Sequence, residues 1–569
     1  MAEGLSNANV YASIIVTEGG TELVFPGADD RSQLLDNPPE SMMNNKKMRW
    51  GVFAPMAVLL VATAVVGIAA PQWFYNIQST VVGFAFTNFG WLFSLTVFVL
   101  IFVCLYVGFS KFGKIRIGGD GAKPTLSKWQ WFAISLTSGI GTGILFWGTA
   151  EPLTHFMDPP ASLGLEPGSE QAATFSIAAV TMQWTIAPYA LYVICGIAIG
   201  YAHYNKGMPY AVSSALYPIF GKRALGGVGT VVDNVCMFAI AGAMSAILGE
   251  GVLQIGSGVS HYTDIVNGPT LWAAIAILIT ITYILSSYTG LQKGIKFLAE
   301  QNTRLFLLLL VFVLVVGPTA YIMTIGTQGT GKYLSDFAEM HLWFSPMDGE
   351  SWPRDWPIFE WALWGANAPL IGMFIARVSY GRTIREFVTV NLLLPAAFGA
   401  FWFWVFGGAA MYFDWKGDGK LWDIINGEGG VPLSLFAFLD ELPLSLLFGI
   451  LMLIAIFISF TTLADSLTTT MSSLTTTGND LKNPEPPAIV KIFWGGLIGL
   501  LAILTVTAGT GGEISGIDAV KQTATLAGFP VLFLIILISY SAVNYLRSDA
   551  KVIDAVEEDD RTETSQLES

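Results

Sequence analysis

Three aromatic side chains share one face of an apolar segment in the first half of the chain. If the segment is helical, Trp184, Tyr189 and Tyr192 fall within about 140° of arc, so they can line one side of a cavity. Trp364 stands in a second apolar segment of this kind. Buried aromatic faces attract a cation whose charge hydrogen bonds cannot meet, which is the chemistry of quaternary-ammonium recognition. Simple packing of the rings is the alternative interpretation.

Glycine is concentrated in another apolar segment, where Gly139, Gly141 and Gly143 fall within five residues. Each glycine costs ~1 kcal/mol of helix stability against Ala, so this helix is expected to be locally unwound. Unwound backbone at membrane depth is tolerated only where it lines a cavity or is buried in protein, and ion and substrate sites are built in this way. Close packing of helices through small residues is the alternative.

Carboxylates inside apolar segments are the third signal. A charge at the middle of a bilayer costs at least ~2.5–3.5 kcal/mol, so it needs a reason. Glu250 and Glu360 lie well inside such segments, as coupling or gating carboxylates or as interior residues that are hydrogen-bonded to neighbours. Glu151, Asp233 and Asp465 lie nearer the ends of their segments, where they are expected to reach the interface or cap a helix.

Composition identifies the elements that must position these residues. The chain has 569 residues, of which 53% are hydrophobic and only 12% charged, with a mean hydropathy of +0.58. This excludes a soluble enzyme and a disordered protein, and the net charge of −14 argues against a nucleic-acid partner. The four histidines and three cysteines show no metal, disulfide or acid–base spacing. No metal site, no cofactor and no enzymatic activity are therefore expected.

The apolar residues form runs of about 20, the length that crosses a lipid bilayer. Twelve membrane spans are predicted, so both the fold class and the main partner, the bilayer, follow from the hydropathy: an all-α integral membrane protein. The spans cover roughly residues 50–72, 88–110, 129–153, 171–202, 231–255, 270–289, 303–327, 356–380, 388–412, 443–465, 489–508 and 526–546.

Basic residues give the orientation, because Lys and Arg are enriched in cytoplasmic loops. With the N-terminus inside, 23 of the 28 Lys and Arg residues fall in cytoplasmic segments. The two long outer segments, about 328–355 and 413–442, are net acidic. We therefore expect a multi-pass protein of the cell (inner) membrane with both termini in the cytoplasm. Residues 1–49 are expected to be a disordered tail, and residues 547–569 an acidic one.

Ordered motifs over residues 50–545 resemble the betaine/choline/carnitine transporter family. The segments that carry this resemblance are the glycine stretch, residues 146–152 (FWGTAEP), 184–192, 290–296 (GLQKGIK), 356–364, 374–377, 381–387 (GRTIREF) and 462–466. The basic motif GRTIREF is the most specific of them.

The resemblance implies a LeuT-type fold over residues 50–546. Spans 3–7 and 8–12 would form two inverted five-helix repeats, with spans 1 and 2 as additions at the N-terminus. It also implies a homotrimer. The first helices of the two repeats are spans 3 and 8, which carry the glycine stretch and the tryptophan cluster, as a site at the repeat interface requires.

The resemblance also implies a function and a substrate site. The protein would import a small quaternary ammonium compound by alternating access. Its aromatic cage would be Trp184, Tyr189, Tyr192 and Trp364, with Trp361 and Asn367 nearby on span 8. The backbone of the glycine stretch would hold the substrate carboxylate. Choline-type members carry an acidic residue at the position of Gly143, so glycine there favours a betaine-like zwitterion, with choline or carnitine as alternatives.

The coupling ion stays open among sodium, protons and exchange. In sodium-coupled members, hydroxyl side chains stand where this chain has Ile240, Met244 and Leu463, whereas Thr462 remains. Sodium takes oxygen ligands, which here would come from Thr462 and from backbone carbonyls such as that of Ile140. Glu250 and Glu360 are the candidates for proton coupling.

Two other functions stay open. Asn367 and Glu360 depart from the family pattern and make another amine or an amino-acid-like solute an alternative substrate. A solute sensor built like a transporter is the alternative from another class. An integral membrane enzyme and a channel are disfavoured, because the histidines do not cluster and no pore segment is repeated.

Overall fold

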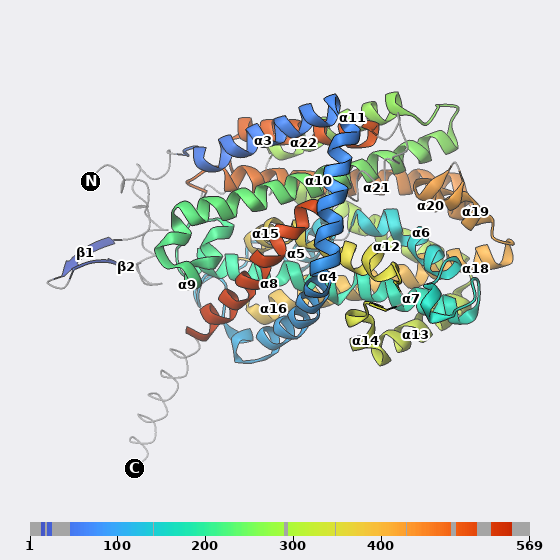
Figure 1. Ribbon diagram of the computed structural model, residues 1–569, viewed down its shortest axis with the longest axis horizontal. Helices are drawn as coiled ribbons and strands as arrows, with labels where there is room; N and C mark the ends of the chain where they lie inside the picture. Colours follow the sequence, from blue (N-terminus) through green and yellow to red (C-terminus); the bar gives the residue numbers. More distant parts are fainter. Residues whose placement is uncertain are drawn as a thin grey trace, which may run out of the picture.

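The computed structural model describes residues 13–17, 20–24, 46–139, 141–289, 294–347, 349–427, 429–479, 485–508 and 525–548. In these ranges the chain is helical apart from two short antiparallel strands, β1 (Ser13–Thr17) and β2 (Gly20–Val24) (Figure 1). The strands fall in the N-terminal segment for which disorder is expected. Residues 1–12, 18–19, 25–45 and 549–569 lie outside the described residues, so the expectation for the tails stays a prediction.

Eleven helices of the described part are long and apolar enough to cross a membrane, and a bent pair makes a twelfth span. The expected all-helical membrane architecture is therefore found. In chain order the spanning helices are α3 (Trp50–Ala69), α4 (Pro71–Phe109), the bent pair α5 (Lys128–Gly139) and α6 (Gly143–Met157), α7 (Glu170–Trp184) with α8 (Ile186–Tyr204), α10 (Gly227–Tyr262), α11 (Pro269–Thr289), α12 (Gly294–Val316), α15 (Phe359–Val378), α16 (Ile384–Val388) with α17 (Leu394–Trp402) and α18 (Gly408–Lys416), α21 (Ser445–Leu474), α22 (Ala488–Ala508) and Thr525–Ser548.

The second span is longer than the predicted range 88–110. Its polar residues do not end the helix, because they bond within it: Gln72 donates to Asn76, and Thr80 donates to the Asn76 carbonyl. The 39 residues of α4 extend for about 58 Å, almost twice the ~30 Å of the hydrocarbon layer. The helix is therefore much longer than the hydrocarbon layer is thick, and Figure 1 shows it running across the direction of its neighbours.

The seventh span is displaced from the predicted range 303–327. Helix α12 covers Gly294–Val316, and the chain breaks at Gly317 and Pro318 before α13 (Thr319–Ser335) begins. Proline lacks an N–H and ends helices, and the Thr319 hydroxyl donates to the Leu314 carbonyl across the break. The outer segments also contain the short helices α14 (Phe337–Leu342), α19 (Lys420–Asn426) and α20 (Gly430–Asp440).

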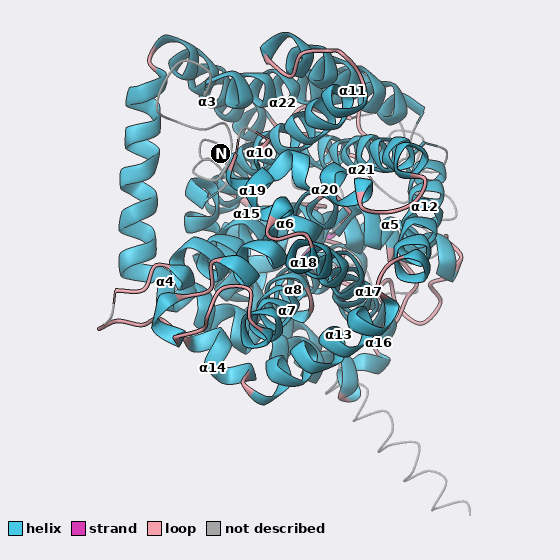
Figure 2. Cartoon of the chain, turned by 90° about the vertical axis from the view of Figure 1, so that its right-hand side faces the viewer, coloured by secondary structure: helices cyan, strands magenta, loops and turns pink. Residues whose placement is uncertain are grey.

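The helices form an inner group and an outer ring. In the most apolar window of Glu170–Tyr204, 94% of the residues are buried, against 22% for Trp50–Gly67. Figure 2 shows α6, α7 and α8 near the centre of the end-on view, with α3, α4, α11 and α12 around them. Outer helices that face lipid expose apolar side chains, whereas inner ones are buried on all sides.

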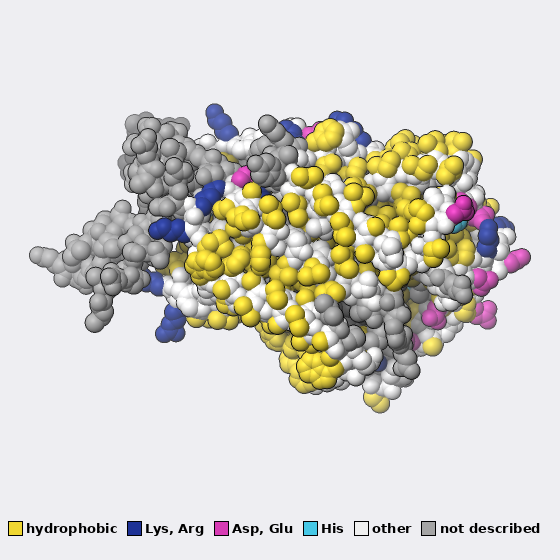
Figure 3. Space-filling view, turned by 90° about the horizontal axis from the view of Figure 1, so that it is seen from above, with side chains coloured by type: hydrophobic (Ala, Val, Ile, Leu, Met, Phe, Trp, Pro, Cys, Tyr) yellow, Lys and Arg dark blue, Asp and Glu magenta, His cyan; other side chains and the backbone are white. Residues whose placement is uncertain are grey.

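Charge separates the two ends of the molecule. In the view of Figure 3, Lys and Arg gather at one end, Asp and Glu at the other, and apolar side chains cover the middle. In Figure 1 the start of α3 and the end of the last, red helix lie on the left, the side of the basic end. This arrangement is the one expected of a membrane protein with a basic inner face.

Ion pairs tie several spans together at the basic end. Arg49 meets the buried Asp233 of α10 at 2.6 Å. Glu485 meets Arg377 at the end of α15 at 2.7 Å and Lys491 of α22 at 2.5 Å. Asp233 therefore does not reach the interface; it is paired inside the protein, as buried charges generally must be.

Candidate functional site

The third span is broken where the glycines stand. Helix α5 ends at Gly139, α6 begins at Gly143, and the two axes differ by 56°. The amides of Leu145 and Phe146 both bond to the carbonyl of Thr142, which restarts the helix. The local unwinding predicted from the glycine spacing is therefore present. Ile140, a candidate ligand for a coupling ion, lies outside the described residues.

The fourth span is also interrupted, between Trp184 at the end of α7 and Ile186 at the start of α8. Thr185 has φ −117° and ψ −119°, outside the helical region, and its hydroxyl bonds back to the Thr181 carbonyl at 2.5 Å. Pro188, two residues into α8, lacks the N–H that a continuous helix would use there. The joint directs the rings of α7 and α8 toward the same region.

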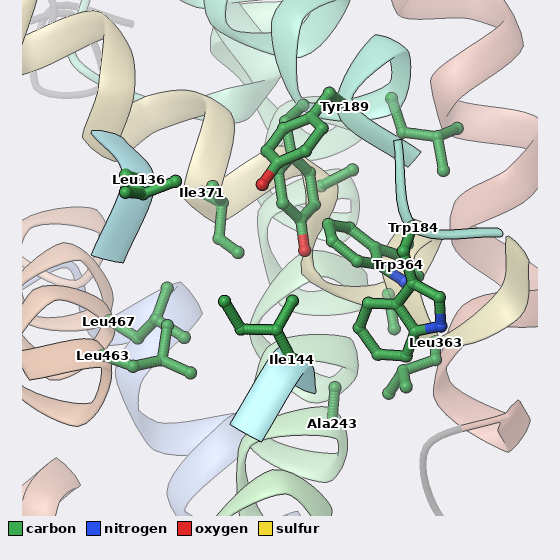
Figure 4. Close-up of a cluster of buried hydrophobic side chains, with 14 of the residues drawn as sticks. Leu136, Ile144, Trp184, Tyr189, Ala243, Leu363, Trp364, Ile371, Leu463 and Leu467 are labelled. Atoms are coloured by element: carbon green, nitrogen blue, oxygen red, sulfur yellow. The ribbon is translucent and has the colours of Figure 1, made fainter. Parts of the chain in front are cut away.

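Three aromatic rings meet around Trp364, and together with it they are the four that the resemblance assigns to the aromatic cage. From the centre of the Trp364 ring, the ring centres lie at 5.7 Å for Trp184, 5.7 Å for Tyr189 and 5.1 Å for Tyr192. The planes of Trp184 and Tyr189 stand at 74° and 65° to that of Trp364. Such steep angles turn the ring faces in different directions, as the walls of a box require. Figure 4 shows Trp184, Tyr189 and Trp364 grouped in this way.

Two of the three glycines contact the cage. A Cβ atom added to Gly143 would lie 2.2 Å from Cζ3 of Trp184, and one added to Gly139 would lie 3.1 Å from Cε1 of Tyr189. Gly141 instead approaches the backbone of Thr137. The break in the third span therefore serves as a surface on which two rings of the cage rest, and this requires glycine at Gly143.

Each indole of the cage donates its N–H to a buried carboxylate. Trp184 Nε1 donates to Glu151 Oε2 at 2.7 Å, and Trp364 Nε1 donates to Glu360 Oε2 at 2.9 Å. Neither carboxylate is more than 1% exposed. With both N–H groups engaged, the indoles offer their faces to a ligand.

The contacts recorded for two other predicted site residues on α15, Trp361 and Asn367, are to groups other than the four rings. The Trp361 ring stacks on His341 at 6.0 Å, and its Nε1 has no hydrogen-bond partner among the described residues. Asn367 Nδ2 donates to the Leu363 carbonyl of its own helix at 2.9 Å. Its Oδ1 is buried and has no partner within the described ranges.

The candidates for ion coupling other than Ile140 are spread over three spans. Thr462 of α21 is fully buried, and its hydroxyl donates to the Ile458 carbonyl at 2.7 Å. Beside it, Leu463 and Leu467 share a buried apolar cluster with Leu136 of α5 and Ile144 of α6 (Figure 4). Glu250 is buried in α10, and Glu360 is the carboxylate at Trp364.

Sequence reasoning missed the role of Glu151. It was expected near the end of its span, but α6 continues through Pro152 to Met157 and buries it completely. His155, one turn further on, lies 3.6 Å from the other carboxylate oxygen. Phe403 was also missed; its ring lies 5.6 Å from that of Trp184. Only the helical spacing of Glu151 and His155 was visible in the sequence.

The described residues contain no group of three or more His, Cys, Asp or Glu side chains that could hold a metal ion. The features that could bind a solute are therefore aromatic faces, buried carboxylates and the backbone of a broken helix. These features suit an organic cation or zwitterion better than a metal.

Comparison with known proteins points in the same direction. The family described as betaine/carnitine/choline family transporters matches residues 51–551. A probable glycine betaine transporter of Desulfitobacterium hafniense is 35% identical over 486 residues, 85% of this chain and 94% of the relative. A glycine betaine transporter of Bacillus subtilis is 33% identical over 513 residues, 90% of this chain and 97% of the relative. An ectoine/hydroxyectoine transporter of Virgibacillus pantothenticus is 31% identical over 509 residues, 90% of this chain and 99% of the relative.

The family match extends over nearly the whole helical core, and the relatives are covered almost from end to end. The resemblance inferred from the sequence motifs is therefore confirmed, and the chain belongs to the betaine/carnitine/choline family of transporters.

Proposed function

We propose that this protein imports a trimethylammonium compound, with a betaine-like zwitterion favoured, across the cell membrane by alternating access. The observation that carries the proposal is the meeting of Trp184, Tyr189, Tyr192 and Trp364 beside the break of the third span. The names of the relatives support it, since two of them are described as glycine betaine transporters.

The arrangement of spans supports a LeuT-type fold. Spans 3–7 and 8–12 would be the two inverted repeats, and α5–α6 and α15 would be their first helices. These are the helices that meet at the cage, as expected for a site at a repeat interface. We further propose a homotrimer with both termini in the cytoplasm, the second point being supported by the basic end of the molecule (Figure 3).

The two ends of the substrate would bind to different parts of the site. The ammonium head would lie against the ring faces, where a desolvated cation–π contact is worth ~2 kcal/mol or more. The carboxylate would take backbone N–H groups freed at the break between Gly139 and Gly143. Closing the outer path around the bound solute, followed by opening the inner path, would complete the cycle.

The coupling is the second part of the proposal. Sodium needs oxygen ligands, but α21 packs on α5 and contributes Leu463 and Leu467 to the apolar cluster there (Figure 4). Thr462 and the backbone carbonyls of the break are the oxygens that the family resemblance would offer to sodium here. This contact favours exchange or proton coupling over sodium symport.

A second candidate substrate is a solute whose cation carries N–H groups, such as another amine or an amino-acid-like compound. The Asn367 Oδ1 is a buried acceptor with no partner in the described part of the chain. A trimethylammonium group offers it no donor, whereas an N–H group does. One relative is named as an ectoine/hydroxyectoine transporter.

Uptake of labelled glycine betaine into proteoliposomes tests the proposal. We expect uptake that is indifferent to an inward sodium gradient and faster when the vesicles are preloaded with unlabelled substrate. Accumulation that depends on the gradient would establish sodium symport and show that Thr462 and backbone oxygens suffice. No uptake by correctly folded protein would reject betaine and favour the second candidate.

A further inference from the structure

Glu360 is one of the two buried carboxylates that accept a hydrogen bond from an indole of the aromatic cage. It lies one helical turn before Trp364 on α15, and it is 1% exposed. The ring of Trp364 is the one that contacts the other three, so a charge held on its edge lies next to the whole cage.

Building on the proposed substrate class, we propose that Glu360 determines the charge specificity of the site. Its carboxylate gives the cage a fixed negative charge, so that the site accepts trimethylammonium compounds of net positive charge in addition to zwitterions. A zwitterion brings its own carboxylate and depends less on this charge, whereas a simple cation has no carboxylate of its own and depends on the charges of the protein.

The break in the third span cannot provide that counter-charge. A side chain at Gly143 would begin with a Cβ atom 2.2 Å from the Trp184 ring, so an acidic residue there would displace the indole. On α15 the carboxylate fits without touching the ring faces, because it meets the indole at its N–H edge. The negative charge at Trp364 therefore comes from the eighth span, in addition to the carboxylate that Glu151 of α6 brings to Trp184.

The hydrogen bond to Trp364 does not by itself require a charged residue. A glutamine would accept the same N–H, and burying an amide costs less than burying a carboxylate. A carboxylate on the N–H edge, however, pushes electron density toward the ring and adds its own field, and both effects strengthen attraction for a cation. These effects are what the glutamate adds to the positioning of the ring.

Equilibrium binding to the purified full-length protein separates charge from structure. Choline serves as the cation and glycine betaine as the zwitterion, since both carry the same head group. In the Glu360→Gln variant we expect the Kd of choline to rise about tenfold, the order of one close charge pair, with little change for glycine betaine. Glu360→Asp, which keeps the charge, retains the wild-type ratio of the two Kd values. Asp414→Asn, at a buried carboxylate of α18 that accepts from the backbone N–H groups of Leu421 and Trp422, is the control and leaves that ratio unchanged.

A Glu360→Gln variant that weakens both ligands by the same factor would show that Glu360 only positions Trp364, and would overturn the inference. The wild-type protein is a test in its own right, because a choline Kd more than about ten times that of glycine betaine would mean that the site rejects net positive charge. If correctly folded wild-type protein binds neither ligand, the proposed function fails, and this inference fails with it.

Discussion

The indole N–H of Trp184 donates to the carboxylate of Glu151 across 2.7 Å, and this bond joins the end of α7 to the interior of α6. Both groups are buried, at 2% and 0% exposure. The bond crosses from the third span to the fourth, so it holds one wall of the cage against the broken helix. Such buried polar bonds cost little when made and much when one partner is removed.

Replacing Glu151 tests whether this hydrogen bond holds the Trp184 ring in place. Glu151→Leu leaves the Trp184 N–H buried without an acceptor, which costs ~1–3 kcal/mol. We expect a lower midpoint of thermal unfolding and weaker binding of both cationic and zwitterionic ligands. Glu151→Gln keeps an acceptor and should restore most of the stability. Equal behaviour of the two variants would show that the hydrogen bond does not hold the ring.

Removing the central ring tests the cage. Trp364→Leu deletes a face that the three other rings surround, and the loss of one desolvated contact worth ~2 kcal/mol corresponds to about a thirtyfold rise in Kd. The measurement is equilibrium binding of glycine betaine, with Kd compared to wild type. Trp73→Leu, on the exposed side of α4, is the control. Unchanged binding by a folded Trp364→Leu protein would exclude these four rings as the site.

The contact between Gly143 and Trp184 predicts strong coupling between two substitutions. Gly143→Ala should displace the indole and weaken betaine binding, although alanine favours helix more than glycine does. Trp184→Phe removes the atoms that clash, so the double variant should bind better than the two single effects predict when added. Gly83→Ala, where a Cβ meets no atom within 4 Å, should change nothing. Additive effects in the double-mutant cycle would contradict this packing.

Glu350 predicts a pH-dependent contribution to stability at the acidic end. Partial burial raises the pKa of Glu350, whereas hydrogen bonds, among them those from the backbone N–H groups of Ser162 and Trp352, lower it. The hydrogen bonds together have the larger effect, so the pKa of Glu350 lies below its ordinary value. A depressed carboxyl pKa stabilises the folded state above the unfolded pKa of ~4.3, and this contribution is lost as the pH falls through the folded value.

The measurement is thermal unfolding of wild type and Glu350→Gln over a range of pH. The wild type should unfold at the higher temperature near neutral pH, and the difference should shrink below about pH 4. Glu339→Gln, at an exposed site on α14, is the control. A difference between wild type and Glu350→Gln that grows as the pH falls would reverse the sign and exclude this account.

Much of the fold could be predicted because hydropathy reports directly on membrane burial. The order of the spans and the break at Gly139–Gly143 follow from run length and from the poor helix propensity of glycine. The extent of α4 could not be read in this way, because Gln72 and Asn76 satisfy each other within the helix and lower its hydropathy without ending it. The break at Gly317 and Pro318 was not predicted, because the residues on both sides are apolar and read as one continuous span.

Of the candidate site, the sequence predicted the aromatic residues on one helix face and the family motifs, but not the partners of the aromatic side chains. Helical spacing placed Trp184, Tyr189 and Tyr192 on one face, and the structure brings them together with Trp364. The partners of the two indoles depend on where separate helices pack, and no periodicity in one segment reports on that. Trp361 shows the converse, because it lies three residues from Trp364 and yet stacks on His341.

Because both indole N–H groups donate to carboxylates, they affect how water occupies the cage and the heat-capacity change on binding. Water meets the indoles of the cage mainly through ring faces, which bind it weakly compared with N–H donors. A solute that enters releases this loosely held water and buries apolar surface, so its binding should be accompanied by a negative change in heat capacity. The affinity of the transporter for its solute is thereby tied to temperature through the solvent, in addition to the contacts made by the ligand itself.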